Sequence, residues 1–370
     1  MTVENYRPTW AEIDLKAIHH NYHTIKRLVS KDEKVMVIVK ADAYGHGSVE
    51  ISRMLERENA DYLGVATLEE AITLRKAGIK TPVLVLGSVF PHEVDAAAEH
   101  GVTLTLCNNE LLRYIERKGT NIRVHVDVDT GMGRIGVWHE EAVDFVAAVK
   151  RVPNIEIEGL YTHFSVAARD KFFTQYQIDS FMNVIASLEA MGIDIPLRHA
   201  ANSIAVVDWK NAHFNMIRPG LIIYGMYPKK TFRKVLKLKP AFQLKTKISF
   251  IKTVSAGRSI SYGRTFIAQA ETRIATLPIG YADGYGRILS AKAQVLIHGH
   301  LFPVVGKVTM DQTMVDVGTR ADIKVGDEVV LIGKQGFGEI TVEDLSRMAG
   351  TIPYEIVTGV TSRVPRVYTY

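Results

Sequence analysis

A lysine at the end of an apolar run is the first residue in this sequence whose position suggests chemistry. Lys40 closes the run VMVIVK and is followed by the glycine-rich segment ADAYGHG. Lysine is seldom buried, and catalytic groups of a barrel lie at the carboxyl ends of its strands. Burial lowers the pKa of an amine, so Lys40 is a candidate for a Schiff base with a carbonyl compound. A strand-end lysine that extends into solvent is the alternative.

Two later segments have residue types suited to binding an anion. HAANS (199–203) and IRPG (217–220) supply Asn202, Ser203 and Gly220 at the ends of two further runs. Barrels commonly bind phosphate groups at the last two strands, where small residues let backbone N–H groups approach closely. These segments therefore predict a phosphate site, with ordinary loops as the alternative.

The segment GMGRIG (131–136) matches the glycine pattern of dinucleotide-binding folds. The strand expected before it has a polar face, and no clear ribose-binding acid ends the next strand. We therefore do not expect a dinucleotide site, and Arg134 is the more informative residue of the segment.

Histidines are the remaining candidates for metal ligands. His298 and His300, and the helical His19, His20 and His23, lack a matching set of carboxylates or cysteines. We interpret them as surface histidines and expect no metal site.

The elements that must position these residues alternate between short β-branched runs and segments of helical period. Helix-period stretches such as LEEAITLRKAG and EEAVDFVAAVKRV separate the strands and end at Gly or Pro. Eight alternating strands predict a (β/α)8 barrel of the TIM type, with an open, doubly wound sheet as the competing architecture. The predicted strands are 35–40, 62–67, 81–87, 101–106, 122–129, 157–164, 197–202 and 214–225.

The run IRVHVDVD (122–129) favours the barrel over the open sheet. Its valines alternate strictly with Arg123, His125, Asp127 and Asp129. An internal strand of an open parallel sheet is covered on both faces and is nearly all apolar, whereas a barrel strand can direct polar groups into the barrel mouth.

After about residue 235 the strand-like runs succeed one another without intervening helices. Only VEDLSRMAG (342–350) has a helical pattern there. We therefore expect two domains: residues 1–235 as the barrel, and residues 236–370 as a separate all-β domain.

Composition excludes several classes of protein. With 47% hydrophobic and 23% charged residues, the 370-residue chain is neither disordered nor fibrous. A net charge of +5 is too small for a dedicated nucleic-acid binder, and no apolar run reaches the roughly 20 residues that span a bilayer. One cysteine, Cys107, and an N-terminus without signal-peptide features predict a cytoplasmic protein without a membrane partner.

Taken together, nine short motifs resemble those of bacterial alanine racemase. They run in order from residue 39 to residue 366, so the resemblance covers both expected domains and is far more specific than any one motif. The motifs are VKADAYGHG, DTGMGRIG, HFSVA, HAANS, IRPG, SYGRTF, GYADGY, GKVTMDQ and TSRVPR.

The resemblance implies pyridoxal 5'-phosphate as cofactor, bound covalently to Lys40. It also implies His163 beside the pyridine ring and Arg218 at the ring nitrogen. A guanidinium has only donors, so it favours an unprotonated nitrogen and weakens the electron sink, which suits proton exchange better than decarboxylation. The remaining cofactor-binding residues are implied to be Tyr44, Asn202, Ser203, Gly220 and Tyr354.

Racemisation needs proton-transferring groups on opposite faces of the substrate carbon. The resemblance implies Lys40 on one face and Tyr262, from the β domain of a second subunit, on the other. A tyrosine with a pKa of about 10 is a poor base at neutral pH, so a cation such as Arg134 is needed nearby. Arg134, Tyr281, Met310 and Asp311 are the expected substrate-binding residues. The expected active unit is a homodimer with shared sites that interconverts L- and D-alanine for peptidoglycan.

One position departs from the family pattern. Many members have a lysine, often carbamylated, two residues before the Asp of DTGMGR, where this chain has Asp127. We hypothesise that Asp127 supplies the negative charge directly. A buried polar residue without a catalytic role is the alternative.

Three other functions fit part of the pattern. Amino-acid decarboxylases resemble this architecture but have a carboxylate where Arg218 stands. A non-enzymatic pyridoxal-phosphate carrier would need the barrel and Lys40 but not Tyr262. Broad-specificity racemases of the cell envelope would be expected to carry a signal segment.

Overall fold

The computed structural model describes residues 6–370, which divide into two compact units. The barrel unit contains residues 19–43 and 48–238, and the C-terminal unit contains residues 6–18, 44–47 and 239–370. Each unit is built from segments that are separated in the sequence.

The barrel unit is a closed barrel of parallel strands. Its strands pair in the order β5-β4-β3-β2-β10-β9-β8-β6, and a further pairing of β5 with β6 closes the circle. The fold class predicted from the sequence is therefore confirmed, and the open sheet is excluded. The strands are β2 (Lys34–Ile38), β3 (Tyr62–Val65), β4 (Val83–Val85), β5 (Thr103–Leu106), β6 (Ile122–Asp129), β8 (Ile155–Tyr161), β9 (Leu197–Asn202) and β10 (Met216–Arg218), with β7 (Val137–Trp138) added beside β6.

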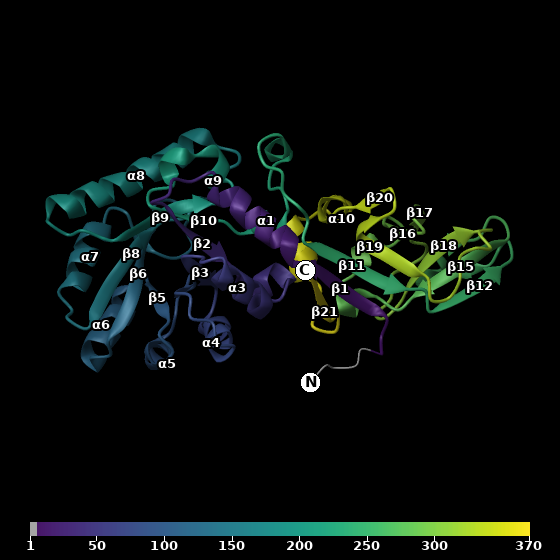
Figure 1. Ribbon diagram of the computed structural model, residues 1–370, viewed down its shortest axis with the longest axis horizontal. Coiled ribbons are helices and arrows are strands. Elements are labelled where there is room, and N and C mark those ends of the chain that lie inside the picture. Colours follow the sequence, from purple (N-terminus) through teal and green to yellow (C-terminus); the bar gives the residue numbers. More distant parts are fainter. Residues whose placement is uncertain (1–5) are drawn as a thin grey trace. The chain divides into compact units, whose positions relative to one another are not determined.

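Helices enclose these strands on the outside, as Figure 1 shows. Several begin where the sequence offers a capping side chain: Thr67, Asn108 and Asp170 each accept a backbone N–H of the first turn. Among residues 6–370, no helix is both long and apolar enough to cross a membrane. The helices are α3 (Ser48–Arg57), α4 (Leu68–Lys76), α5 (Val94–Glu99), α6 (Asn109–Lys118), α7 (Ala142–Lys150), α8 (Lys171–Ala190) and α9 (Ala205–Asp208); α1 (Leu15–Lys26) starts in the C-terminal unit and ends in the barrel unit.

Strand β6 has the alternation expected from its sequence. The buried His125 of this polar face lies against His199 of β9, with its Nδ1 2.8 Å from the His199 Nε2. Space for this imidazole comes from Gly159 on β8, where an added Cβ would lie 2.4 Å from the His125 Nδ1. The barrel unit thus buries a pair of hydrogen-bonded histidines.

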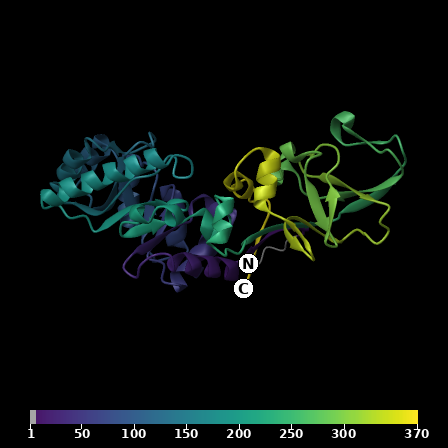
Figure 2. The same ribbon diagram turned by 90° about the horizontal axis from the view of Figure 1, so that it is seen from above.

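The C-terminal unit is built mainly of strands, with helices α10 (Val342–Ala349) and α11 (Pro353–Thr358) grouped beside them in yellow in Figure 2. The largest sheet has the order β17-β16-β19-β11-β1-β21, with β20 paired to β19; a second sheet has the order β12-β15-β18, and β13 pairs with β14. The strands are β1 (Thr9–Asp14), β11 (Phe242–Lys247), β12 (Phe250–Val254), β13 (Ser259–Ile260), β14 (Phe266–Ile267), β15 (Thr272–Leu277), β16 (Gln294–Ile297), β17 (His300–Pro303), β18 (Thr313–Gly318), β19 (Glu328–Gln335), β20 (Gly338–Ile340) and β21 (Arg366–Thr369).

Three details of this unit were not predicted from the sequence. Strand β1 is not part of the barrel: it pairs antiparallel with β11 and parallel with β21. Strands β11 and β12 follow each other closely in the chain but belong to different sheets. Helix α11 comes after α10 and begins at Pro353, whose fixed φ suits the first position of a helix.

Candidate active site

Lys40 lies just beyond a barrel strand rather than at its last position. Strand β2 ends at Ile38, and Lys40 begins the one-turn helix α2 (Lys40–Gly45). The four residues after it have φ of 51° to 54°, the left-handed conformation that L-residues avoid. Such strain, about 1–2 kcal/mol per residue, is typical of functional sites. A hydrogen bond holds the start of this turn, because the Ala41 N–H donates to the Glu70 carboxylate at 2.7 Å.

The surroundings of Lys40 lower the pKa of its amine. Burial is the largest cause, and the positive charge of Arg134 adds to it, while the carboxylate of Glu70 opposes both. The charge of Arg218 lowers the pKa further. A larger share of the Lys40 amine is therefore uncharged and nucleophilic at neutral pH than for a solvated lysine.

The loop after β6 carries Arg134 and is built around a carboxylate. Asp129 accepts the backbone N–H groups of Gly131, Met132 and Gly133 at 2.8–3.1 Å. In a dinucleotide-binding loop such N–H groups face the pyrophosphate, but here they are occupied by the chain's own Asp129. The glycines of GMGRIG thus belong to a turn that wraps around Asp129, and the Arg134 side chain is exposed.

Arg218, at the end of β10, is almost completely buried and makes many hydrogen bonds. Its two terminal nitrogens donate to His199 Nδ1 at 2.6 Å, to the backbone oxygens of His199, Thr162 and Ala200, and to His163 Nδ1 at 3.3 Å. Burial lowers the pKa of Arg218 to about 10, so it remains a cation at neutral pH. Its Nε–H has no hydrogen-bond partner among residues 6–370 and is available to another acceptor.

Neutral histidines support Arg218. Because an arginine only donates, His199 Nδ1 must accept, and its Nε2–H then donates to His125 Nδ1 at 2.8 Å. Burial lowers the pKa of His125 to about 3 and that of His199 well below its ordinary value. Burial, followed by the charges of Arg218, Arg134 and Lys40, likewise lowers the pKa of His163. All three imidazoles are therefore uncharged at neutral pH.

Asp127 is a buried carboxyl group at the carboxyl end of β6. It is 4% exposed. Burial raises its pKa to about 7, despite the opposing charges of Arg218 and Arg134 and a hydrogen bond with Tyr161. Asp127 thus lies within the electrostatic reach of both arginines, but with a pKa of about 7 it is ionised in only part of the molecules at neutral pH.

The expected phosphate-binding residues of the barrel unit meet at the ends of β9 and β10. The Ser203 hydroxyl accepts the Gly220 N–H at 2.9 Å. The Asn202 side chain accepts the N–H groups of Ile204 and Ala205 at 3.0 and 3.2 Å, which shapes the turn into α9. The geometry brings these two strand ends together.

Two tyrosines expected near the phosphate lie together in the C-terminal unit. The rings of Tyr44 and Tyr354 have centroids 5.6 Å apart. Burial raises the pKa of Tyr44 above its ordinary range and that of Tyr354 to about 12. Both hydroxyls therefore stay protonated at neutral pH and can donate to an anion.

Three further predicted residues lie on adjoining loops of the C-terminal unit. The N–H of Tyr281 donates to Thr309 at 3.0 Å, beside Met310. Gly280 fits so tightly there that an added Cβ would lie 2.4 Å from the Met310 carbonyl oxygen. The loop of Tyr262 packs against the same segment, since Ser261 donates to the Lys307 carbonyl at 2.7 Å. Tyr262, Met310 and Tyr281 are 71%, 53% and 40% exposed.

Sequence reasoning missed the ion-pair network that holds these loops. Asp283 is fully buried, and its carboxylate binds Arg7 at 2.5–2.6 Å and Arg363 at 3.4 Å. Arg363 also pairs with Asp311 at 2.7 Å. Asp283 and Arg363 belong to the motifs GYADGY and TSRVPR, so the signal was present, but their pairing requires the fold.

The predicted residues therefore form two groups. Lys40, Arg134, His163 and Arg218 interact electrostatically in the barrel unit. Tyr262 belongs to the other unit, together with Tyr281, Met310 and Asp311.

Comparisons with known proteins cover almost the whole chain. Residues 13–228 match the family described as "Alanine racemase, N-terminal domain", and residues 241–368 match "Alanine racemase, C-terminal domain". The chain is 45% identical over 367 residues to an alanine racemase from Halothermothrix orenii, a match covering 98% of this chain and 97% of that relative.

Solved structures are equally similar. An alanine racemase from Clostridium difficile has a TM-score of 0.94 at 41% identity, covering 99% of this chain and 97% of that chain. A structure of alanine racemase from Bacillus anthracis with bound L-Ala-P has a TM-score of 0.94 at 38% identity, covering 100% of this chain and 96% of the other. Fold, length and sequence thus agree across both units.

Proposed function

Because this chain belongs to the alanine racemase family of enzymes, we propose that it interconverts L-alanine and D-alanine with pyridoxal 5'-phosphate, using Lys40 and Tyr262 on opposite faces of the substrate. One observation carries the proposal: a lysine of lowered pKa and a buried arginine with an unused donor share the carboxyl end of one barrel.

The donor set of the barrel fits the cofactor. Lys40 supplies the amine for a covalent bond to the aldehyde carbon. The Nε–H of Arg218 suits a ring nitrogen that accepts a hydrogen bond. The Ser203 hydroxyl accepts the Gly220 N–H and can donate its own proton to a phosphate, with Asn202 at the adjoining strand end. Tyr44 and Tyr354, of the C-terminal unit, have protonated hydroxyls that can donate to an anion.

Bound pyridoxal phosphate supplies an electron sink that makes the α-proton of an amino acid removable. The chain's own residues decide which reaction this leads to. Arg218 is a cation at neutral pH and can only donate hydrogen bonds, so it favours an unprotonated ring nitrogen. An unprotonated ring nitrogen would favour simple proton exchange over decarboxylation.

Inversion requires one group to take the proton and another to return it on the opposite face. We assign these tasks to the Lys40 amine and the Tyr262 hydroxyl. Arg134 contributes a positive charge near Lys40. We propose that this charge attracts the carboxylate group of the amino-acid substrate. Met310, Asp311 and Tyr281 are proposed to limit the size of the substrate side chain.

A homodimer is part of this proposal. Tyr262, Tyr281 and Met310 form a set of exposed apolar side chains on adjoining loops, and aromatic residues and methionine are enriched where subunits meet. Such exposure favours coverage by a second copy of the chain. We propose that residues 236–370 complete the active site of the partner, which holds its own Lys40 within residues 1–235.

A mixing experiment tests the shared site. Lys40→Ala and Tyr262→Phe are each expected to be nearly inactive. Hybrid dimers of the two would contain one native site each, because the intact lysine and the intact tyrosine come from different chains. A random mixture should regain about a quarter of the native sites. If both residues act within one chain, mixing restores nothing.

The biological setting is also proposed. We infer a cytoplasmic enzyme whose D-alanine supplies peptidoglycan synthesis. Its one cysteine, Cys107, is buried and free, which is compatible with a reducing compartment.

A further inference from the structure

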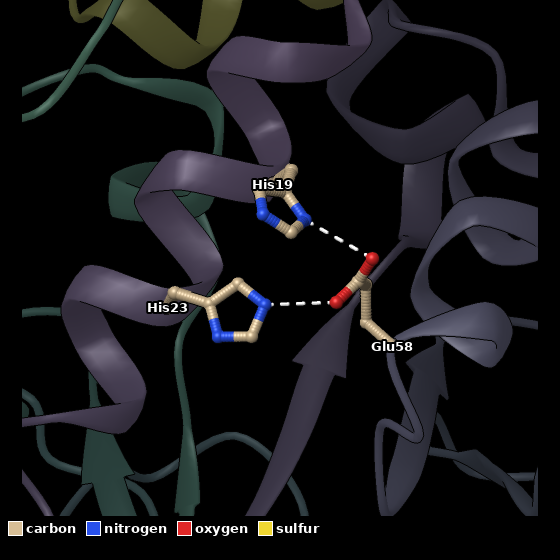
Figure 3. A group of neighbouring side chains, drawn as sticks. All are labelled: His19, His23 and Glu58. Carbon is tan, nitrogen blue, oxygen red and sulfur yellow. Dashed lines mark hydrogen bonds and ion pairs between the residues drawn. The ribbon is translucent and has the colours of Figure 1, made fainter.

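Two histidines and a glutamate outside the residues assigned to the reaction meet on the surface of the barrel unit. His19 and His23 are one turn apart on α1, and Glu58 directly follows α3 (Figure 3). The two carboxylate oxygens of Glu58 divide between the rings: one lies 3.0 Å from His19 Nδ1 and the other 2.8 Å from His23 Nε2. No carboxylate lies near these histidines in the sequence, and the fold brings Glu58 to them.

We propose that His19, His23 and Glu58 bind a divalent transition-metal ion, with Zn²⁺ as the best match. The three ligand atoms, one from each residue, all lie within 4.8 Å of one another. Zinc binds imidazole nitrogen and carboxylate oxygen at about 2.0–2.2 Å, and three protein ligands leave a fourth position for water. Two imidazoles favour zinc, nickel or cobalt over the oxygen-preferring Mg²⁺ and Ca²⁺.

The cluster is already arranged for binding. Residues four apart on a helix lie on the same face, and the His19 and His23 ring centroids are 4.4 Å apart. The fully buried Tyr22 packs edge-on against His23 with centroids 5.5 Å apart, which restricts that ring. The metal would therefore need little ordering of side chains. His20, on the same helix, is different because its Nε2 is 2.7 Å from the Lys237 carbonyl oxygen.

Accessibility also suits an exchangeable ion. The side chains of His19, His23 and Glu58 are 51%, 40% and 26% exposed, so an ion can enter from solvent. Once bound, it would link α1 to the end of α3. We expect the metal to stabilise the barrel unit and to leave the reaction chemistry unchanged.

The site can be tested by titrating the cofactor-loaded enzyme with zinc chloride and measuring the heat of binding by calorimetry. The chain should bind one Zn²⁺ at this site, and H19Q or H23Q should each weaken it by about tenfold or more. H20Q is the matched control, because it removes a histidine of the same helix from outside the cluster. Zinc should raise the melting temperature of the wild type and H20Q but not of H23Q.

Two measurements guard against a folding artefact. Circular dichroism should show H19Q, H23Q and E58Q folded like the wild type. Co²⁺ should give the wild type and H20Q a visible absorption band that these three variants lack, and excess Mg²⁺ should not displace zinc. Equal zinc affinity in the wild type and the double variant H19Q/H23Q would overturn the proposal. So would a loss of zinc affinity in H20Q as large as the loss in H19Q or H23Q.

Discussion

Replacing Asp127 with asparagine is expected to stabilise the enzyme at neutral and alkaline pH but not in acid. Burial raises the pKa of Asp127 from its ordinary 3.8 to about 7. Below about pH 4 the carboxyl group is protonated in both folded and unfolded chains, so it contributes no penalty. Between these pKa values the unfolded chain has released a proton that the folded chain retains, and stability falls as pH rises.

The size of the effect comes from the same two pKa values. One pKa unit corresponds to roughly 1.4 kcal/mol, so the shift from 3.8 to about 7 is worth about 4 kcal/mol. Asparagine has a similar volume and never ionises. The stability advantage of Asp127→Asn should therefore grow by roughly 1.4 kcal/mol per pH unit from about pH 4 to about pH 7 and then level off.

Urea unfolding of both proteins across this pH range, followed by circular dichroism, measures the difference. Asp32→Asn is the matched control, because the Asp32 side chain is exposed and forms no ion pair or hydrogen bond among residues 6–370. A stability difference for Asp127→Asn that does not change with pH would refute the reasoning. It would mean that the arginine charges compensate fully for the burial of the carboxylate.

The same variant tests the catalytic hypothesis for Asp127. If its charge replaces that of a carbamylated lysine in supporting Arg134, the asparagine should lower kcat and change its pH profile. Unchanged kcat and an unchanged profile would leave Asp127 as a buried polar residue without a role in the reaction.

Three further substitutions test the contacts that hold the site. Arg218→Met should cost about 3 kcal/mol or more, measured by urea unfolding, because buried carbonyl groups lose their donor. Asp283→Ala should cost about 3 kcal/mol and lower kcat/KM, because Arg7 loses its buried partner and the loops beside it loosen. Gly136→Ala should cost about 2 kcal/mol or more and reduce activity, because the Gly136 φ is 111° and an added Cβ would lie 3.3 Å from the Asp127 Cγ. If any of the three variants has the stability of the wild type, the contact that it removes or crowds does not hold the site.

The barrel was predictable because its signals are local. The alternation in residues 122–129 already indicated a strand with a polar side facing the barrel interior, and His125 is buried there. Strand β1 was not predictable in this way. Its partners, residues 242–246 and 366–369, lie hundreds of positions away, and only the assembled sheet explains why residues 9–14 are extended.

The site shows the same division between local and distant signals. Lys40 stood out by residue type, but the left-handed turn after it opposes the local preferences of Ala41, Ala43 and Tyr44, so no propensity argument predicts it. Glu58 could not be assigned to His19 and His23 from sequence, because 35 residues separate it from His23. Contacts of this kind depend on how the elements pack.

Proton exchange at the substrate α-carbon tests the central claim most directly. The enzyme would be incubated with L-alanine in deuterated water. D-Alanine formation and deuterium incorporation at the α-carbon would be measured together, for the wild type and for Lys40→Ala and Tyr262→Phe. The account predicts D-alanine carrying deuterium, and loss of D-alanine in both variants. Full racemisation by Tyr262→Phe, or exchange confined to L-alanine in the wild type, would contradict two bases on opposite faces.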